Sequence, residues 1–305
     1  MHTPDSKIDF ARAKLTFDKL YDPGSTDIDA ALRQIDGMVQ TIRAMAGPSA
    51  TAQQRLIALR TYIYKAGPWN QNNPFTYDFA DPLGRKTSNQ LLATYLRTRR
   101  GNCVSMPMLF AALAQRLSLD VTLSTAPHHV FVKYHDDAAG RWINLETTSG
   151  ANPARDVWLR HLFPMTDEAI ANGIYMKTLS KKEALAAMAD IVLTGESDRG
   201  RYDEMLAVTN VLRPYYPNNL AVLLAPAAAA DGMAQRDFVS KYPRESDIPP
   251  EMLGRLDVLA RRASDALNHA YALGWRDTGD AARVALERAA AGAPKNAGSA
   301  TLPQR

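Results

Sequence analysis

The fold is decided by the stretch RRGNCVSMPMLFAALAQRL at residues 99–117. It places Cys103, the only cysteine of the chain, just before a run of apolar residues. These residues recur at steps of three and four, at Met106, Leu109, Phe110, Leu113 and Leu117. Such spacing gives a helix one continuous apolar face. We therefore expect a buried central helix with the thiol at its N-terminus.

Strands that carry imidazoles and a carboxylate are expected after this helix. The sequence reads HHVFV at residues 128–132 and WINLETT at residues 142–148. Branched and aromatic residues favour strands at 120–125, 129–135 and 142–147, and the polar stretch 136–140 makes the last two a hairpin. Thiol, imidazole and carboxylate thus follow one another on a helix and two strands.

The hairpin predicts which side chains share a face. If His135 pairs with Gly140, His129 lies directly opposite Glu146, and directly opposed side chains point to the same side of the sheet. His128 then points to the other face, because neighbouring strand residues alternate. Asn144 shares the face of Glu146 and is the alternative partner for the histidine.

These three groups are what a cysteine nucleophile requires. Unpaired amides at the helix N-terminus and a nearby imidazole both favour the thiolate of Cys103. His129 would act as the base, and Glu146 would orient its ring. The backbone amide of Cys103 is a natural donor to an oxyanion. Further candidates for binding the oxyanion or the substrate are Asn102, Trp69, Asn70, Gln71, Asn144 and His128.

The same residues resemble a known family. The run RRGNC, APHHVFVK at 126–133 and WINLETT at 142–148 are similar to the transglutaminase-like superfamily, and closest to a bacterial branch with a helical, tetratricopeptide-like tail. The resemblance implies a papain-like fold and a cysteine–histidine–acid triad, with Cys103 as nucleophile and His129 as histidine. Glu146 stands where the family usually has aspartate. Many members are proteases, amidases or acyl-transfer enzymes, and some have lost activity.

The remaining sequence predicts helices on both sides of this core. Helical periodicity runs from Ile8, from Thr26 and from a Thr51 N-cap, and Ser88 is the expected cap of a short helix that ends near residue 96. Two more helices are expected around 220–231 and 250–273. The predicted fold class is α+β, with a central helix packed on an antiparallel sheet. The expected parts are N-terminal helices at 1–50, a core at 51–175, a tetratricopeptide-like helical region at 176–291 and a disordered tail at 292–305.

The composition limits which classes of partner the chain is expected to bind. The chain has 305 residues and a formal net charge of +4 without a dense basic run, which argues against nucleic-acid binding. No apolar stretch has the length of a membrane span. Adjacent strand histidines point apart and His135 is distant along the strand, so no metal or other cofactor is expected. The polar N-terminus predicts a cytoplasmic protein, or a periplasmic one if a native leader has been removed.

Two functions remain open from sequence. The first is a cysteine hydrolase or acyltransferase that cleaves an amide or peptide bond through a thioester on Cys103. The second is an inactive module of the same fold that binds a peptide and recruits a protein partner through its helical tail.

Overall fold

The computed structural model describes residues 3–24, 26–81 and 84–277 of the chain. These residues form two compact units, one of residues 6–164 and the other of residues 3–5 together with 165–277. The tail expected to be disordered at 292–305 lies outside the described residues. The domain bounds expected from the sequence stay predictions.

The first unit begins with helices at the positions that the apolar periodicity predicts. Thr51 caps the third helix in a capping box, because its hydroxyl accepts from the backbone N–H of Gln54 while the Gln54 side chain accepts from the N–H of Thr51. The helices expected from Ile8, Thr26 and Thr51 are confirmed. They are α1 (Phe10–Tyr21), α2 (Ile28–Ala46) and α3 (Ala52–Tyr64).

The short helix α4 (Leu92–Thr98) corrects one expectation. Ser88 does not cap it but lies in a 3₁₀ turn, Thr87–Gln90. The cap is Asp18 of α1, whose carboxylate accepts from the backbone N–H of Leu92 at 2.7 Å. Lys14 pairs with the same buried carboxylate. A residue far away in the sequence therefore fixes the beginning of α4.

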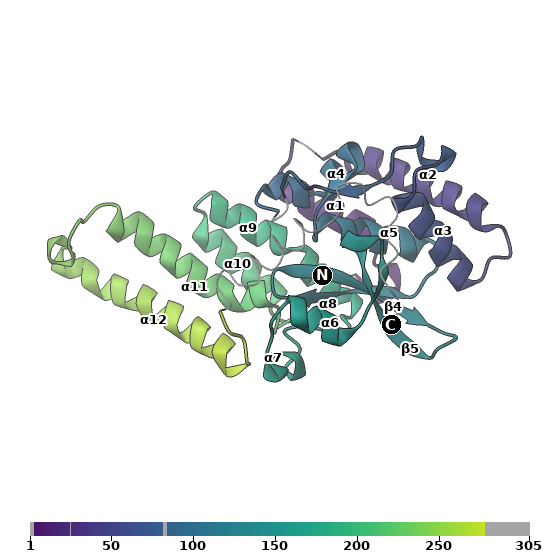
Figure 1. The fold of residues 1–305 in the computed structure, drawn as a ribbon. Coiled ribbons are helices and arrows are strands. Elements are labelled where there is room, and N and C mark those ends of the chain that lie inside the picture. The colour runs from purple at the N-terminus through teal and green to yellow at the C-terminus, as the bar shows by residue number, and fades with distance from the viewer. Residues whose placement is uncertain (1–2, 25, 82–83, 278–305) are drawn as a thin grey trace. The chain divides into compact units, whose positions relative to one another are not determined.

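The central helix α5 (Ser105–Arg116) is buried along residues 105–114, as its pattern predicts. It contacts α1, α2, α3 and α4, and also strands β3 and β4 of the sheet (Figure 1). The sheet is antiparallel in the order β3 (Val121–Ala126), β4 (His129–Asp136), β5 (Arg141–Glu146) and β6 (Asn152–Ala154). Helix α6 (Asp156–Leu162) follows, and β1 (Thr76–Tyr77) pairs in parallel with β2 (Arg100–Gly101).

The hairpin register differs from the expected one by two residues. His135 pairs with Trp142 and Asp136 with Arg141, so Gly140 belongs to the turn and not to a strand. The Asp136 carboxylate accepts from the N–H groups of Ala138 and Ala139, which closes the turn early, and Gly140 takes φ +62°. Because a shift of two residues preserves the face, His129 and Glu146 still lie on the same side of the sheet.

The second unit is helical. Consecutive long helices pack against one another, α9 on α10, α10 on α11 and α11 on α12 (Figure 1). The helices expected around 220–231 and 250–273 are confirmed, whereas the tetratricopeptide-like character of the region stays a prediction. The elements are α7 (Asp167–Ala171), α8 (Lys181–Met188), α9 (Asp190–Asp198), α10 (Tyr202–Leu212), α11 (Leu220–Ala234), a π-helical turn (Gln235–Val239) and α12 (Pro250–Ala272).

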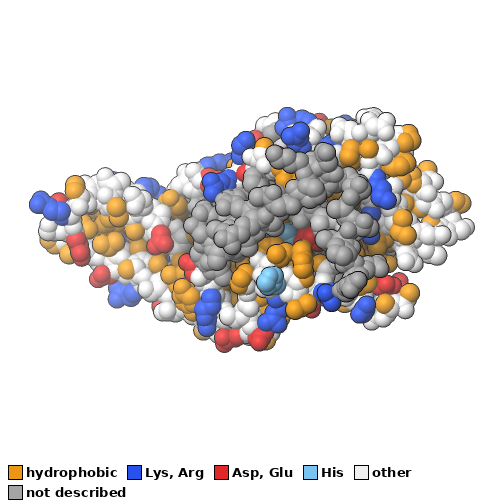
Figure 2. Space-filling view, viewed as in Figure 1, with side chains coloured by type: hydrophobic (Ala, Val, Ile, Leu, Met, Phe, Trp, Pro, Cys, Tyr) orange, Lys and Arg blue, Asp and Glu red, His pale blue; other side chains and the backbone are white. Residues whose placement is uncertain are grey.

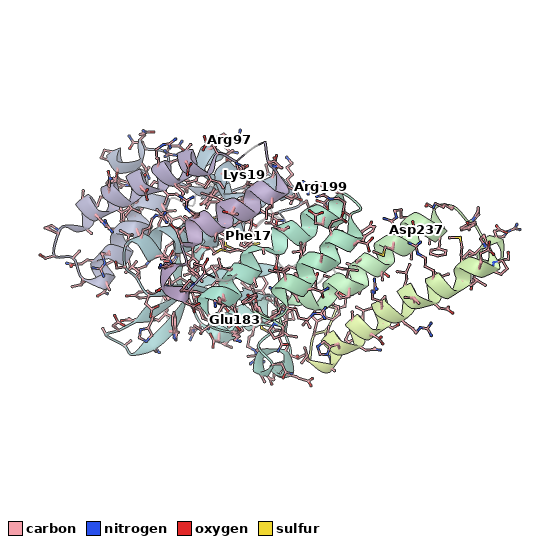
Figure 3. The ribbon with its side chains drawn as sticks, turned by 180° about the vertical axis from the view of Figure 1, so that it is seen from behind. Phe17, Lys19, Arg97, Glu183, Arg199 and Asp237 are labelled. Atoms are coloured by element: carbon pink, nitrogen blue, oxygen red, sulfur yellow. The ribbon has the colours of Figure 1, made fainter. Side chains whose placement is uncertain are left out.

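The turn between α11 and α12 is fixed by charge and by apolar packing. Asp237, labelled in Figure 3, accepts from Arg236 at 2.8 Å and from Arg255 of α12 at 2.6 Å. Phe238 and Leu259 are buried in the same small core cluster. The long pair α11 and α12 is therefore joined at this end by both kinds of contact.

Charge is scattered over the face seen in Figure 2. Among the coloured side chains of this view, Lys and Arg lie between acidic and apolar ones and form no continuous basic stripe. None of the described helices combines the length and the apolar character needed to cross a bilayer.

Candidate functional site

The thiol of Cys103 lies two residues before α5, in a turn that Asn102 holds. The Asn102 side-chain oxygen accepts from the N–H groups of Val104 and Ser105 at 3.0 and 3.1 Å, and the Ser105 hydroxyl accepts from the N–H of Asn102. This reciprocal cap satisfies the first amides of the helix. A side chain on Gly101 would collide with Ser105 and with the Tyr95 ring at 2.7 Å. The backbone ahead of the thiol is thus closely packed.

His129 and Glu146 form a buried pair on the sheet. The distance from His129 Nε2 to Glu146 Oε2 is 2.7 Å, and the two side chains are 2% and 5% exposed. The other carboxylate oxygen accepts from the N–H and the hydroxyl of Thr148 at 2.9 and 2.6 Å. Both oxygens of Glu146 are therefore engaged, which fixes the carboxylate that orients the ring.

The charges of this pair stabilise each other. Burial alone would lower the pKa of His129, but the Glu146 carboxylate and the nearby Cys103 thiol raise it to about 10. Burial alone would raise the pKa of Glu146, but His129 and Thr148 lower it below its ordinary value. The folded site therefore favours an imidazolium beside a carboxylate.

Packing holds the imidazole in one orientation. Its ring stacks on Phe163 with centroids 4.5 Å apart and an interplanar angle of 13°. Because Nε2 is engaged by Glu146, Nδ1 is the ring nitrogen left for the thiol. Nδ1 is buried and makes no direct hydrogen bond to a described residue, since the Cys103 thiol donates instead to the carbonyl oxygen of His128 at 3.6 Å.

His128 lies in a tight turn and not in the strand. Ala126 pairs with His129, so only Pro127 and His128 connect β3 to β4. His128 adopts φ +56°, a left-handed conformation that is uncommon for a residue other than glycine. The contact between His128 and the thiol of Cys103 is made by the backbone carbonyl oxygen of His128.

Asn144, the alternative partner of the histidine, has other contacts. Its amide donates to the carbonyl oxygen of Ala154 at 3.0 Å and to the Asp156 carboxylate at 2.6 Å. These bonds hold β5 to β6 and to the first turn of α6. Glu146, and not Asn144, contacts His129.

The three loop candidates, Trp69, Asn70 and Gln71, are bound mainly to the end of α3. Asn70 donates both side-chain N–H bonds to backbone carbonyls, of Tyr62 at 2.7 Å and of Lys65 at 2.8 Å, and Trp69 also donates to Lys65. Gln71 is exposed and left-handed. With its donors used, the Asn70 side chain holds the loop closed, and a role of this loop in binding the oxyanion stays a prediction.

Tyr77 is a site residue that the sequence did not single out. The pairing of β1 with β2 sets Tyr77 beside Gly101, two residues before Cys103. Burial, with the nearby Cys103 and Glu146, raises the pKa of its phenol well above the ordinary value. The phenol therefore stays protonated and can donate a hydrogen bond. A strand of two residues that pairs with a distant segment has no periodic pattern, so no signal in the sequence marked Tyr77.

Comparison with known proteins gives a family match. The family model described as the transglutaminase-like superfamily matches residues 29–187, which is more than half of the chain and runs from α2 through α8. No curated protein and no solved structure matches the chain significantly.

Proposed function

The chain belongs to the transglutaminase-like superfamily, and we propose that it is a cysteine-dependent hydrolase or acyltransferase that acts on an amide or peptide bond. The observation that carries the proposal is the buried contact between His129 and Glu146 with the Cys103 thiol beside it. A histidine that merely fills a core needs no carboxylate with both oxygens engaged. A carboxylate held in this way orients the ring and stabilises its charged form.

In the proposed reaction Cys103 starts as the thiolate and His129 as the imidazolium, whose Nδ1 carries the proton that the thiol has given up. The sulfur of Cys103 then attacks the carbonyl carbon, and the electron pair of the C=O bond moves to its oxygen. The backbone N–H of Cys103, which donates to no described residue, would hold this oxyanion. As the C–N bond breaks, His129 returns its proton to the leaving amine and a thioester remains on Cys103.

Release of the acyl group reverses these roles. Nδ1 takes a proton from water, or from a second amine, as that nucleophile attacks the thioester. The electron pair of the breaking C–S bond returns to sulfur. Water gives a hydrolase and an amine gives an acyltransferase, and the same residues support either acceptor.

Alkylation of Cys103 by iodoacetamide across pH tests the proposal. In the wild type we expect fast reaction well below pH 8, because His129 stabilises the thiolate, and we expect this advantage to disappear in His129→Ala. Cys103→Ala controls for modification elsewhere. If wild type and His129→Ala react equally, with a midpoint near that of a free cysteine at about 8.5, the chain is an inactive peptide-binding module instead.

The substrate class can be sought in the same preparation. Incubation with peptide and cell-wall-fragment libraries, followed by mass spectrometry, should reveal an acyl adduct on Cys103 in the wild type. Cys103→Ser should trap a more slowly hydrolysed ester. A clean absence of both adducts across the libraries would count against the enzyme.

A further inference from the structure

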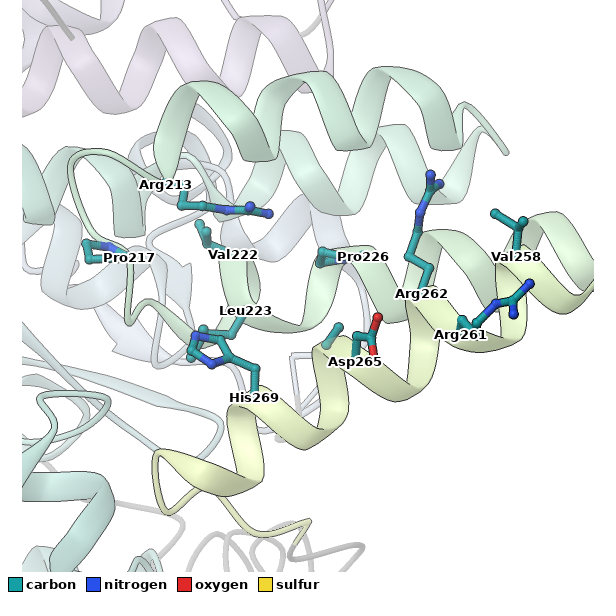
Figure 4. Close-up of a pocket in the computed structure, with 11 residues that line it drawn as sticks. Arg213, Pro217, Val222, Leu223, Pro226, Val258, Arg261, Arg262, Asp265 and His269 are labelled. Carbon is teal, nitrogen blue, oxygen red and sulfur yellow. The ribbon is translucent and has the colours of Figure 1, made fainter.

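A groove in the second unit lies far along the chain from Cys103. It has a volume of about 530 Å³ and is lined by side chains of α11, α12 and the end of α10 (Figure 4). Its floor is apolar and consists of Val222, Leu223 and Pro226 of α11, with Val258 of α12 at one side. Val258 is 51% exposed, so the groove presents apolar surface to solvent.

The composition of α11 explains why the base of the groove is apolar. The helix reads LAVLLAPAAAADGMA, with apolar residues on every side, a pattern typical of a helix that is covered all round. Among the described elements of this unit, α9, α10 and α12 are its long-helix neighbours. Val222 and Leu223 are only 1% and 7% exposed, so the apolar surface that the groove offers to solvent comes mainly from Pro226 and Val258.

Three arginines surround this floor. Arg213 lies at the end of α10, and Arg261 and Arg262 lie on α12; Figure 4 shows Arg213 and Arg262 beside the space above α11. The guanidinium groups of the three make no hydrogen bond or ion pair with another described residue. Asp265 is the one carboxylate among the lining residues, so the groove carries a net charge of +2 when its histidine is neutral, from three arginines and one aspartate.

Charge decides which occupant the groove fits. Residues 278–305 of the chain carry four basic and two acidic side chains, so the chain's own C-terminal segment does not complement it. A second copy of a chain with a formal net charge of +4 is a poor match for the same reason. A complementary occupant is acidic and carries apolar side chains that cover the floor.

We propose that this groove binds an acidic peptide segment of a partner protein, in which leucine-sized side chains contact Pro226 and Val258 while flanking carboxylates pair with Arg213, Arg261 and Arg262. The proposal is independent of the reaction at Cys103. It assigns the second unit a recruiting role through a defined surface.

Fluorescence anisotropy on the full chain tests this proposal. The probe is a labelled amphipathic peptide of about 15 residues built from Leu, Ala, Asp and Glu, and the comparison peptide has Asn and Gln in place of the acids. The acidic probe should bind at least about tenfold more tightly and lose affinity as salt rises. Arg213→Glu with Arg262→Glu should weaken binding about tenfold or more.

Two further variants separate the groove from general electrostatics. Arg33→Glu with Arg97→Glu changes the net charge equally at exposed positions of the first unit and should leave binding unchanged. Val258→Ser removes apolar surface at an exposed position and should weaken binding about fivefold without a change of charge. Thermal melting and circular dichroism show that each variant is folded.

Three results would overturn the proposal. One is equal binding of the acidic and amide peptides. Another is an equal loss of affinity in the groove variant and in its charge-matched control. The third is binding to vesicles of phosphatidylserine and phosphatidylcholine that is tighter than peptide binding and depends on the groove arginines, because this would assign the groove to a membrane surface.

Discussion

At the scale of single residues, the buried pair of His129 and Glu146 predicts a pH dependence of stability. The pKa of His129 is raised from 6.5 to about 10 in the folded protein. Its contribution to the free energy of unfolding is therefore complete below pH 6.5 and is lost as pH rises toward 10. The pKa of Glu146 is lowered from 4.5, so its contribution is present above that pH and is lost on acidification.

We therefore expect the urea unfolding midpoint to fall between pH 6.5 and 10, with a slope from this histidine of at most about 1.4 kcal/mol per pH unit. Glu146→Gln should flatten this alkaline loss, because the ring then has no charged partner. NMR of the His129 ring is a direct check that does not depend on the variant's stability. A ring that titrates near 6.5 in the folded wild type would contradict the assignment.

The phenol of Tyr77 predicts a specific loss of rate. If its hydroxyl donates to the substrate carbonyl or to the oxyanion, Tyr77→Phe should lower kcat by roughly 10- to 1000-fold. Tyr64→Phe is the matched control. The Tyr64 hydroxyl is buried near Glu146 without a hydrogen-bond partner among the described residues, so its removal should cost neither rate nor stability. Equal rates in wild type and Tyr77→Phe would leave Tyr77 as a packing residue only.

At the scale of elements, the cap at the beginning of α5 links stability to reactivity. Asn102→Ala removes the acceptor for two backbone amides and should cost about 1 kcal/mol. It should also slow alkylation of Cys103, because the thiol loses its fixed position. Thr51→Ala removes a comparable cap from α3 at a similar cost of about 1 kcal/mol. This second variant should react as fast as the wild type, which urea unfolding and iodoacetamide kinetics can establish together.

The sequence predicts those helices that are marked by local patterns, such as apolar spacing and N-cap residues. The apolar period predicted α2 and α5, and Thr51 predicted the beginning of α3 because an N-cap is a local signal. Non-local contacts were not readable. Asp18 caps α4 from a distant helix, and β1 pairs with β2 across more than twenty residues.

The candidate site also has features that the sequence predicts and features that it does not. The order of Cys103, His129 and Glu146 on a helix and two strands was readable, because each stands at a marked point of a periodic element. The register was not, since the turn chemistry of Asp136 and Gly140 decided it. The contact of the His128 carbonyl oxygen with the thiol depends on the left-handed backbone of His128. The identity of the residue did not predict that conformation.

At the scale of the whole molecule, the family match and the compact units have different bounds. The matched residues, 29–187, extend past the division at residue 164 and include α7 and α8 of the second unit. The transglutaminase-like region therefore does not coincide with one compact unit. A shortened protein that ends at residue 164 would lack part of the matched region, so tests of activity require the full chain.

The division into units predicts two steps of unfolding. Units with separate cores commonly violate two-state behaviour, so calorimetry of the full chain should show two transitions. Thr51→Ala weakens a cap in the first unit and should lower one transition. Asn219→Ala removes the side chain that caps α11 by accepting from the N–H of Val222 at 3.0 Å, and it should lower the other. Because each cap is worth about 1 kcal/mol, the shifts should be a few degrees. A single transition that both variants lower would mean that the two cores unfold as one cooperative structure.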